Sequence, residues 1–314
     1  MTTTPPSTGT VNGRSPELLA AGALLAMGAA WGSTFFLIKG LLDRIGVADL
    51  LAVRFAIASV VLVAAGFRHL RMSRTTLLHG AVLGCLFGLA QLLQTAGLGL
   101  TSASSSGFLT GLYVVITPLL GAALFRSRTP GWTWVAVGLA TLGLGVLSLN
   151  GLPSLQGGRA PFGGTGELLT LAAAAIYAGH ILGLSRWSKP ENAISLTIVQ
   201  MITITLICTI GALPGGISLP QRGWDWAAVL YLAVIAGVMT MFLQTWAQAR
   251  VDPTRAAVFM ASEPVWAAVF AITLGTESVT WRMLVGGASI VAAMYLVELA
   301  PRLGLRRAGP ARPV

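Results

Sequence analysis

Residues 18–38 read LLAAGALLAMGAAWGSTFFLI and contain no charged side chain. An α-helix rises about 1.5 Å per residue, so about 20 such residues cross the roughly 30 Å hydrocarbon core of a bilayer. This stretch is therefore predicted to be a membrane-spanning helix. The whole chain of 314 residues has the same character, because 55% of it is hydrophobic and only 10% is charged. Soluble domains carry about 25% charged residues, so the composition excludes a soluble enzyme, a disordered chain and a disulfide scaffold.

Nine further apolar segments meet the same length criterion, and a β-barrel would instead show alternating segments of about ten residues. Charged or Gly/Pro-containing breaks separate most of the segments, whereas the break at residues 101–106 carries no charge. The predicted fold is an all-α membrane protein with ten transmembrane helices. The ten segments are 18–38, 50–67, 77–98, 105–124, 132–149, 166–184, 193–213, 226–249, 256–274 and 281–298.

Basic residues in the breaks predict the sidedness of the chain, because cytoplasmic loops carry an excess of Lys and Arg. One face holds five of them: Lys39, Arg44, Arg159, Arg222 and Arg282. The other face holds 14: Arg14, Arg68, Arg71, Arg74, Arg126, Arg128, Arg186, Lys189, Arg250, Arg255, Arg302, Arg306, Arg307 and Arg312. Both termini are therefore expected in the cytoplasm, with the protein in the cytoplasmic membrane. Residues 1–17 read as a disordered tail and 299–314 as a basic tail, and no cleaved signal peptide is expected.

The net charge of +10 does not indicate nucleic acid, because the basic residues lie in short clusters between apolar runs. Cys85 and Cys208 lie inside apolar segments and read as packing residues. The sequence has no metal-ligand cluster, no cofactor motif and no enzyme signature. The expected partners are a small-molecule substrate and the lipid bilayer, and the sequence does not indicate an oligomeric state.

Short motifs of the first half of the chain recur in the second half, on the other side of a hydrophilic linker at residues 150–165. Glu17-Leu18-Leu19 recurs as Glu167-Leu168-Leu169, and Leu93-Gln94-Thr95 recurs as Leu243-Gln244-Thr245. This divides the chain into five-helix repeats at 18–149 and 166–298. A repeat with an odd number of spans inserts its second copy upside down, and inverted-topology repeats are typical of secondary transporters.

The chain also resembles the EamA branch of the drug/metabolite transporter superfamily over residues 18–298. Four motifs carry the resemblance: Ala29-Ala30-Trp31-Gly32-Ser33-Thr34-Phe35, Val53-Arg54-Phe55, Ser105 to Leu112 leading to Pro118, and Ala261-Ser262-Glu263-Pro264-Val265. The resemblance implies ten helices in two inverted repeats. It also implies export of small metabolites, amino acids among them, through a central cavity lined by the first, third, fourth, sixth, eighth and ninth spans.

Ionisable residues inside spans are rare and usually face the interior or a cavity. Glu263 in the ninth span is a candidate for proton coupling or substrate contact, or for a neutral hydrogen bond to a neighbouring helix. His180 in the sixth span is a candidate for a proton relay, or for a packing residue held by a hydrogen bond. For Arg54 in the second span, three roles stay open: attraction of the substrate, an ion pair between helices, and snorkelling to the membrane surface.

Amide and aromatic side chains suggest where a cavity lies. Gln91 and Gln94 share one face of the third span, as Gln244 and Gln248 share one face of the eighth. These four amides fit two readings equally well: the lining of a polar cavity, or hydrogen bonds between helices. Further cavity candidates are Trp31, Ser33, Tyr177, Trp246 and Trp266, and Pro118 and Pro264 are predicted to kink their helices.

These features predict a secondary transporter that exports amino acids or related small metabolites by alternating access, with proton coupling left open. An uncoupled facilitator of the same substrates is the alternative. An intramembrane enzyme, the alternative from another class, lacks a visible catalytic pair.

Overall fold

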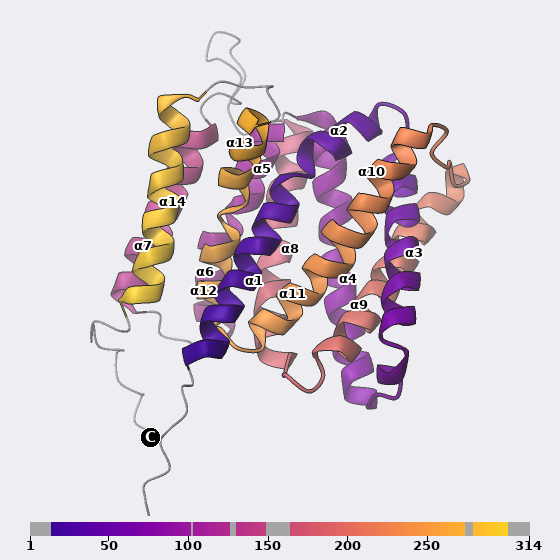
Figure 1. The fold of residues 1–314 in the computed structure, drawn as a ribbon, viewed down its shortest axis with the longest axis horizontal. Coiled ribbons are helices and arrows are strands. Elements are labelled where there is room, and N and C mark those ends of the chain that lie inside the picture. Colours follow the sequence, from indigo (N-terminus) through magenta and orange to yellow (C-terminus); the bar gives the residue numbers. More distant parts are fainter. Residues whose placement is uncertain (1–13, 102, 126–129, 149–163, 274–278, 301–314) are drawn as a thin grey trace, which may run out of the picture.

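The computed structural model describes residues 14–101, 103–125, 130–148, 164–273 and 279–300, and no β-strand occurs among them. The helices lie side by side in one bundle (Figure 1). In the first half they are α1 (Arg14–Gly32), α2 (Phe35–Leu42), α3 (Val47–Ala65), the short η1 (Phe67–His69), α4 (Arg74–Leu100), α5 (Ala103–Gly111), α6 (Tyr113–Phe125) and α7 (Gly131–Ser148).

The second half also contains both long and interrupted helices. It consists of α8 (Thr165–Trp187), α9 (Ala193–Ala212), η3 (Leu213–Gly215), α10 (Gly223–Ala233), the π-helical η4 (Val234–Met239), α11 (Thr240–Gln248), α12 (Pro253–Met260), α13 (Glu263–Thr273) and α14 (Trp281–Leu299).

Six helical stretches are long and apolar enough to cross a membrane: Pro16–Leu42, Val47–Ala65, Arg74–Leu100, Thr165–Trp187, Ala193–Gly215 and Gly223–Gln248. Three shorter apolar helices are Leu109–Phe125, Gly131–Val146 and Leu284–Leu296. The described part of the chain is thus all-helical and contains several helices that can cross a membrane, as predicted from the composition. Because α1 begins at Arg14, residues 14–17 are helical rather than part of a disordered tail. Residues 1–13, almost all of the 150–165 linker and residues 301–314 lie outside the described part.

Two helix starts show how local sequence sets the element boundaries. The Ser73 hydroxyl accepts a hydrogen bond from the backbone N–H of Thr76 at 3.1 Å and caps α4. The Asp252 carboxylate accepts one from the N–H of Arg255 at 2.9 Å and caps α12, where Pro253 occupies the first turn. Both caps satisfy donors that the first turn of a helix leaves unpaired.

The packing pairs join the two halves of the chain. Helix α4 packs against α8 and α9, α1 packs against α11 and α13, and α3 packs against α9 and α10. Helices α7 and α14 pack against each other at one edge of the bundle (Figure 1). Neither half therefore forms a separate core, and the interior of the bundle is shared between them.

Glycines bring α4 close to its two neighbours. A Cβ at Gly84 would lie 2.8 Å from the backbone oxygen of Gln200 on α9. A Cβ at Gly97 would lie 2.7 Å from the backbone oxygen of Gly166 on α8. Such close backbone approaches are typical of small residues between membrane helices, where packing rather than hydrophobic burial drives association.

Two interrupted spans place irregular backbone in the middle of the bundle. Between α1 and α2, the Ser33 hydroxyl donates to the carbonyl of Ala30 at 2.7 Å and the Thr34 hydroxyl to that of Trp31 at 2.7 Å. These hydroxyls occupy carbonyls that a continuous helix would use for its own backbone bonds. Between α10 and α11, the π-helix loosens the regular bonding pattern. Broken backbone at membrane depth is tolerated where it is buried in protein or lines a cavity.

The two prolines predicted to kink helices lie differently. Helix α6 continues through Pro118, and the interruption of the fourth span lies earlier, at Leu112 after Gly111. Pro264 is the second residue of α13, directly after the break that follows α12. A proline in the first turn needs no backbone donor, so Pro264 is compatible with the restart of the ninth span at Glu263.

Candidate functional site

A cavity lies in the middle of the bundle, where the interrupted helices meet. The empty space between its walls measures about 610 Å³, counting the part that is open to solvent. Its walls come from α1–α6, α8 and α11–α13, and the lining residues are Trp31, Thr34, Phe35, Ile38, Arg54, Gln91, Gln94, Thr95, Leu98, Thr110, Tyr113, Tyr177, Ile181, Gln244, Met260 and Glu263.

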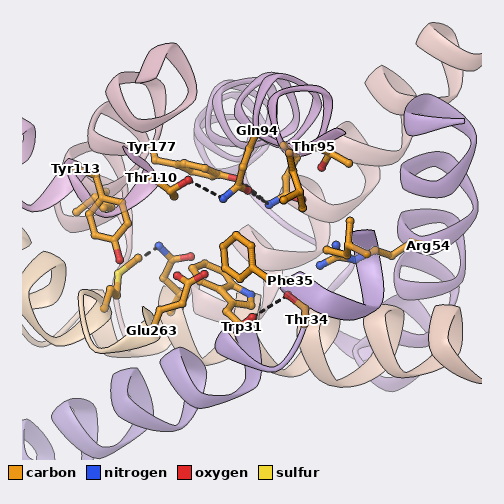
Figure 2. Close-up of a pocket in the computed structure, with 16 residues that line it drawn as sticks. Trp31, Thr34, Phe35, Arg54, Gln94, Thr95, Thr110, Tyr113, Tyr177 and Glu263 are labelled. Atoms are coloured by element: carbon orange, nitrogen blue, oxygen red, sulfur yellow. Dashed lines mark hydrogen bonds between the residues drawn. The ribbon is translucent and has the colours of Figure 1, made fainter. Parts of the chain in front are cut away.

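One wall of the cavity is a chain of hydrogen bonds that joins α4 to α8 and α5. The Gln91 amide donates to the Tyr177 hydroxyl at 2.6 Å, and that hydroxyl donates to the Gln94 carbonyl oxygen at 2.9 Å. The Gln94 amide then donates to the Thr110 hydroxyl at 3.0 Å (Figure 2). The two amides of α4 therefore line the cavity and also hold helices together.

Gln244 of α11 is bonded much more weakly than its sequence counterpart Gln94. Its amide nitrogen lies 3.8 Å from the sulfur of Met260, which is a poor acceptor. Its carbonyl oxygen is buried and has no hydrogen-bond partner among the described residues. The Gln244 carbonyl is therefore a free acceptor at the cavity wall.

Trp31 is held by the π-helical segment of the eighth span. Its indole N–H lies 3.1 Å from the carbonyl oxygen of Ala236 and 3.0 Å from the hydroxyl of Thr240. Because both acceptors belong to one turn, the ring has a fixed orientation. Trp31 thus presents a rigid apolar surface to the cavity, beside Phe35 (Figure 2).

Arg54 reaches the same turn from α3 and is 3% exposed. Its Nε donates to the carbonyl of Leu232 at 3.1 Å and its Nη2 to that of Ala236 at 3.2 Å. The guanidinium also lies 4.9 Å from the centre of the Phe55 ring. Within the described ranges Arg54 has no carboxylate partner. The second span, which the resemblance leaves out of the cavity, therefore contributes a cation to it.

Glu263 is the first residue of α13 and is 7% exposed. It makes no hydrogen bond or ion pair with any residue that the structure describes. Its side chain lies between those of Tyr113 and Trp31 and points into the cavity, and Arg54 enters from the opposite side (Figure 2). The cavity thus holds one acidic and one basic group that do not pair with each other.

Several residues predicted to line a cavity lie outside this one. The Ser33 hydroxyl is shared between the Ala30 carbonyl and the hydroxyl of Tyr231, 2.6 Å away. The Gln248 amide donates to the carbonyl of Ile181 at 3.1 Å. The Ser33 hydroxyl and the Gln248 N–H therefore have partners on their own or a neighbouring helix, whereas the Gln248 carbonyl oxygen is buried without one among the described residues.

Two predicted tryptophans also lie away from the cavity lining. The guanidinium of Arg250 lies over the Trp246 ring, 4.0 Å from the ring centre, close to the end of α11. Trp266 faces the backbone of Gly28, where a Cβ would lie 3.8 Å from its ring. The Trp246 contact lies within one span, and the Trp266 contact joins α13 to α1.

His180 is fully buried and lies between α8 and α9, outside the cavity lining. Its Nε2 is 2.8 Å from the Oε1 of Gln200, and its ring packs against Phe87 with the ring centres 5.1 Å apart. Its Nδ1 has no partner among the described residues. The structure therefore places His180 in an interhelical contact.

Sequence reasoning missed nine further residues that line the cavity. None of them is an Asp, Glu, Lys, Arg or His, the residue types that stand out inside an apolar span. The polar ones carried a usable signal, because Thr34 and Thr110 lie within two of the motifs that carry the family resemblance. Among the apolar ones, Phe35 also lies within such a motif, whereas nothing in the sequence distinguishes the others from lipid-facing residues. The set is Thr34, Phe35, Ile38, Thr95, Leu98, Thr110, Tyr113, Ile181 and Met260.

Similar proteins match nearly the whole chain. The threonine/homoserine exporter RhtA of Escherichia coli K12 is 30% identical over 282 residues, which cover 86% of this chain and 88% of that protein. The inner membrane transporter YedA of the same strain is 29% identical over 93% of each chain. An uncharacterized transporter of Archaeoglobus fulgidus is 27% identical over 88% of this chain and 84% of its own length.

A solved crystal structure has the same fold, with a TM-score of 0.74 at 22% sequence identity. It covers 92% of this chain and 99% of the other. The sequence matches the EamA-like transporter family twice, over residues 18–149 and 164–299. These two ranges take in both predicted repeats, so the chain belongs to the EamA-like transporter family of drug/metabolite transporters.

Proposed function

We propose that this protein exports small metabolites, amino acids or related compounds, across the cytoplasmic membrane by alternating access. The observation that carries the proposal is the position of the cavity, whose walls come from both family repeats. A site at the interface of two repeats can open to either side when one repeat rocks against the other. A small-molecule substrate and a lipid bilayer follow from membership of a transporter family.

The packing pairs support an inverted repeat. In the predicted repeat, α1 corresponds to α8, α4 to α10 and α11, and α6 to α13. The contact between α4 and α8 then has its counterpart in the contact between α11 and α1, and that between α6 and α8 in the contact between α13 and α1. The α4–α9 contact likewise becomes the α10–α3 contact. The α7–α14 and α3–α9 contacts each join a span to its own counterpart. Such an exchange of partners is expected of two repeats related by a pseudo-two-fold axis.

Ten crossings are the number that this arrangement requires. Each interrupted pair, such as α1 with α2 or α12 with α13, would then form one crossing. Five crossings in each half invert the second half and return both termini to one side. The basic residues, 14 on one face against 5 on the other, favour the cytoplasm for that side.

The substrate class is proposed from the relatives and the cavity together. RhtA is named for export of threonine and homoserine. The cavity offers amide, hydroxyl and charged groups along with aromatic surface, which suits a small compound with several polar groups. A phosphorylated substrate would favour several Lys or Arg side chains, and the described lining contains one, Arg54.

Whether transport is coupled to protons depends on Glu263, the acidic residue in the lining. Coupling through this carboxylate is one form of the proposal, and an uncoupled facilitator is the other. His180 is a weaker candidate because it lies outside the lining. An intramembrane enzyme is disfavoured, since the relatives are named transporters and the described lining holds no Ser/His pair and no pair of carboxylates.

The export activity can be tested by an unbiased screen of metabolites released from cells that produce this chain. Gln94→Phe should block the cavity, whereas Leu89→Phe on the same helix adds the same ring at a position that is 46% exposed. We expect one or more metabolites to accumulate outside cells with the wild type and with Leu89→Phe, but not with Gln94→Phe. Identical release from all three, or no release above that of cells lacking the chain, would contradict the proposal.

Proton coupling is tested separately, in proteoliposomes loaded with a metabolite that the screen identifies. We expect an imposed pH gradient to accelerate transport by the wild type and to have little effect on Glu263→Gln. If the variant responds to the gradient like the wild type, coupling through Glu263 is wrong and the uncoupled form of the proposal remains.

A further inference from the structure

Two buried ionisable groups, one basic and one acidic, line the cavity without pairing with each other. Arg54 is 3% exposed and Glu263 is 7% exposed. The two ion pairs found in the described part of the chain, Arg44 with Asp225 and Arg255 with Glu17, involve neither of them. Charges at membrane depth are costly and normally pair with each other or with a ligand. A ligand that carries both a positive and a negative charge would balance the two groups at once.

Arg54 is held in place while part of its guanidinium remains available. Its hydrogen bonds to Leu232 and Ala236 use two of the five N–H groups of an arginine. Trp31 donates to the same Ala236 carbonyl, so the turn that orients the arginine is itself fixed. The remaining N–H groups belong to a planar fork that suits a carboxylate, because such a fork can donate two parallel hydrogen bonds.

Glu263 offers complementary chemistry from the opposite wall. Its carboxylate has no donor within the described residues, and the free carbonyl oxygen of Gln244 also belongs to the lining. A carboxylate and an amide carbonyl are both acceptors without a proton to donate, whereas an ammonium group has three donors. The aromatic faces of Trp31 and Tyr113 border the same part of the cavity (Figure 2) and favour a cation as well.

We infer that Glu263 and Arg54 determine substrate specificity by binding the two charges of a zwitterionic amino acid at once. The ammonium group of the substrate lies against Glu263 and the Gln244 carbonyl, and its carboxylate lies against Arg54. The substrate thereby balances both buried charges, which a compound with a single charge cannot do. This inference rests on the proposed function and adds which end of the substrate each wall recognises.

The polar wall between the two charges accommodates the rest of the substrate. Gln94, Thr95 and Thr110 provide amide and hydroxyl groups there, and Phe35 and Ile38 provide apolar surface. A mixed surface of this kind accepts small polar or aliphatic side chains without a dedicated partner for each. Selectivity for the zwitterion therefore comes from the two ends of the cavity.

The inference is tested by binding measurements on the purified full-length protein in nanodiscs. The probes are the twenty protein amino acids, taken one at a time, followed by two blocked forms of the one that binds most tightly. Its amide keeps the ammonium group and lacks the carboxylate, and its N-acetyl derivative keeps the carboxylate and lacks the ammonium group. We expect each blocked form to bind the wild type at least about tenfold more weakly than the parent amino acid.

Single variants then assign each end of the substrate. Glu263→Gln should weaken binding of the parent amino acid by about tenfold or more and leave binding of the N-acetyl form unchanged. Arg54→Gln should weaken the parent in the same way and leave binding of the amide unchanged. Asp225→Asn is the matched control, because Asp225 is a buried carboxylate that pairs with Arg44 outside the cavity lining. It should bind all three probes like the wild type.

The outcomes separate this inference from the proposed function. If no amino acid binds, or if Glu263→Gln weakens the parent and both blocked forms equally, the inference is overturned. The proposed function still stands in that case if the release screen finds another exported metabolite. Should Arg54→Gln fail to fold, the blocked probes on the wild type and the Glu263→Gln arm decide the matter without it.

Discussion

Tyr177 and His180 are three residues apart on α8, yet they belong to two different regions of the bundle. The Tyr177 hydroxyl joins Gln91 and Gln94 at the cavity wall. The His180 ring is fully buried and bonds Gln200 on α9. Both rings pack edge-on against Phe87. Two polar residues of similar sequence context therefore serve a site and an interhelical contact, according to what lies opposite each of them.

The sequence counterparts Gln94 and Gln244 show a related difference. Gln94 bonds to residues on two neighbouring helices, whereas the Gln244 carbonyl has no partner within the described ranges. A polar side chain between helices contributes to stability only when its groups are paired, because an unpaired buried group keeps its desolvation cost. Gln94 therefore serves both stability and the cavity, and Gln244 serves the cavity.

The largest expected effect is the loss of transport when the cavity wall is altered. Tyr177→Phe removes the hydroxyl that links Gln91 to Gln94, so Gln91 keeps only its 3.4 Å contact with the Gln94 oxygen and Gln94 only its bonds to Gln91 and Thr110. We expect transport in proteoliposomes to fall by more than about tenfold, since a misplaced contact in a site is worth that much. The melting temperature in detergent should change little, because both amides remain at the cavity. A variant that transports at the wild-type rate would contradict the assignment of this wall to the site.

The converse effect is expected at His180. His180→Leu leaves the Gln200 carbonyl oxygen buried without its partner and should lower the free energy of unfolding by about 1–2 kcal/mol. Transport per folded molecule should stay near the wild-type value. The double variant His180→Leu with Gln200→Leu should be less destabilised than the sum of the two single variants, because no single amide is then left unpaired. A strong loss of transport at wild-type stability would instead return His180 to the transport mechanism.

The smallest expected effect is on the free energy of unfolding when Gln94 or Gln244 is replaced. Gln94→Leu breaks bonds to two helices and should lower the free energy of unfolding by about 1 kcal/mol. Gln244→Leu breaks only a weak contact with the Met260 sulfur and should change it by less than about 0.5 kcal/mol. Unfolding in mixed micelles monitored by circular dichroism measures both. Equal destabilisation would show that the two glutamines are bonded alike in the membrane.

Much of the fold followed from local features of the sequence. The apolar segments predicted the helices, because a chain in lipid must satisfy its backbone hydrogen bonds within each helix. The motifs around Trp31, Arg54 and Pro118 indicated the family that the matches over residues 18–149 and 164–299 confirm. The count of ten crossings and the inverted relation of the halves stay predictions that the packing pairs support.

The candidate site was only partly predictable. Among the residues singled out, Trp31, Gln91, Gln94, Tyr177, Gln244, Glu263 and Arg54 line the cavity, and Ser33, Trp246, Gln248, Trp266 and His180 do not. The position of a residue within an apolar segment can be read from the sequence, but the helix that faces it cannot. Gln248 illustrates this, because the carbonyl that it binds, that of Ile181, lies 67 positions earlier in the chain.

The sequence by itself determined that this protein is a helical membrane transporter, because hydropathy and repeated motifs are properties of consecutive residues. Only the tertiary structure decided which polar residues share one cavity. It brought Arg54 of α3 and Glu263 of α13 to opposite walls of the same space, although 209 positions separate them in the chain. The physical reason is that helix packing, which joins residues far apart in the chain, selects the partner of each buried polar group and decides which of these groups border the cavity.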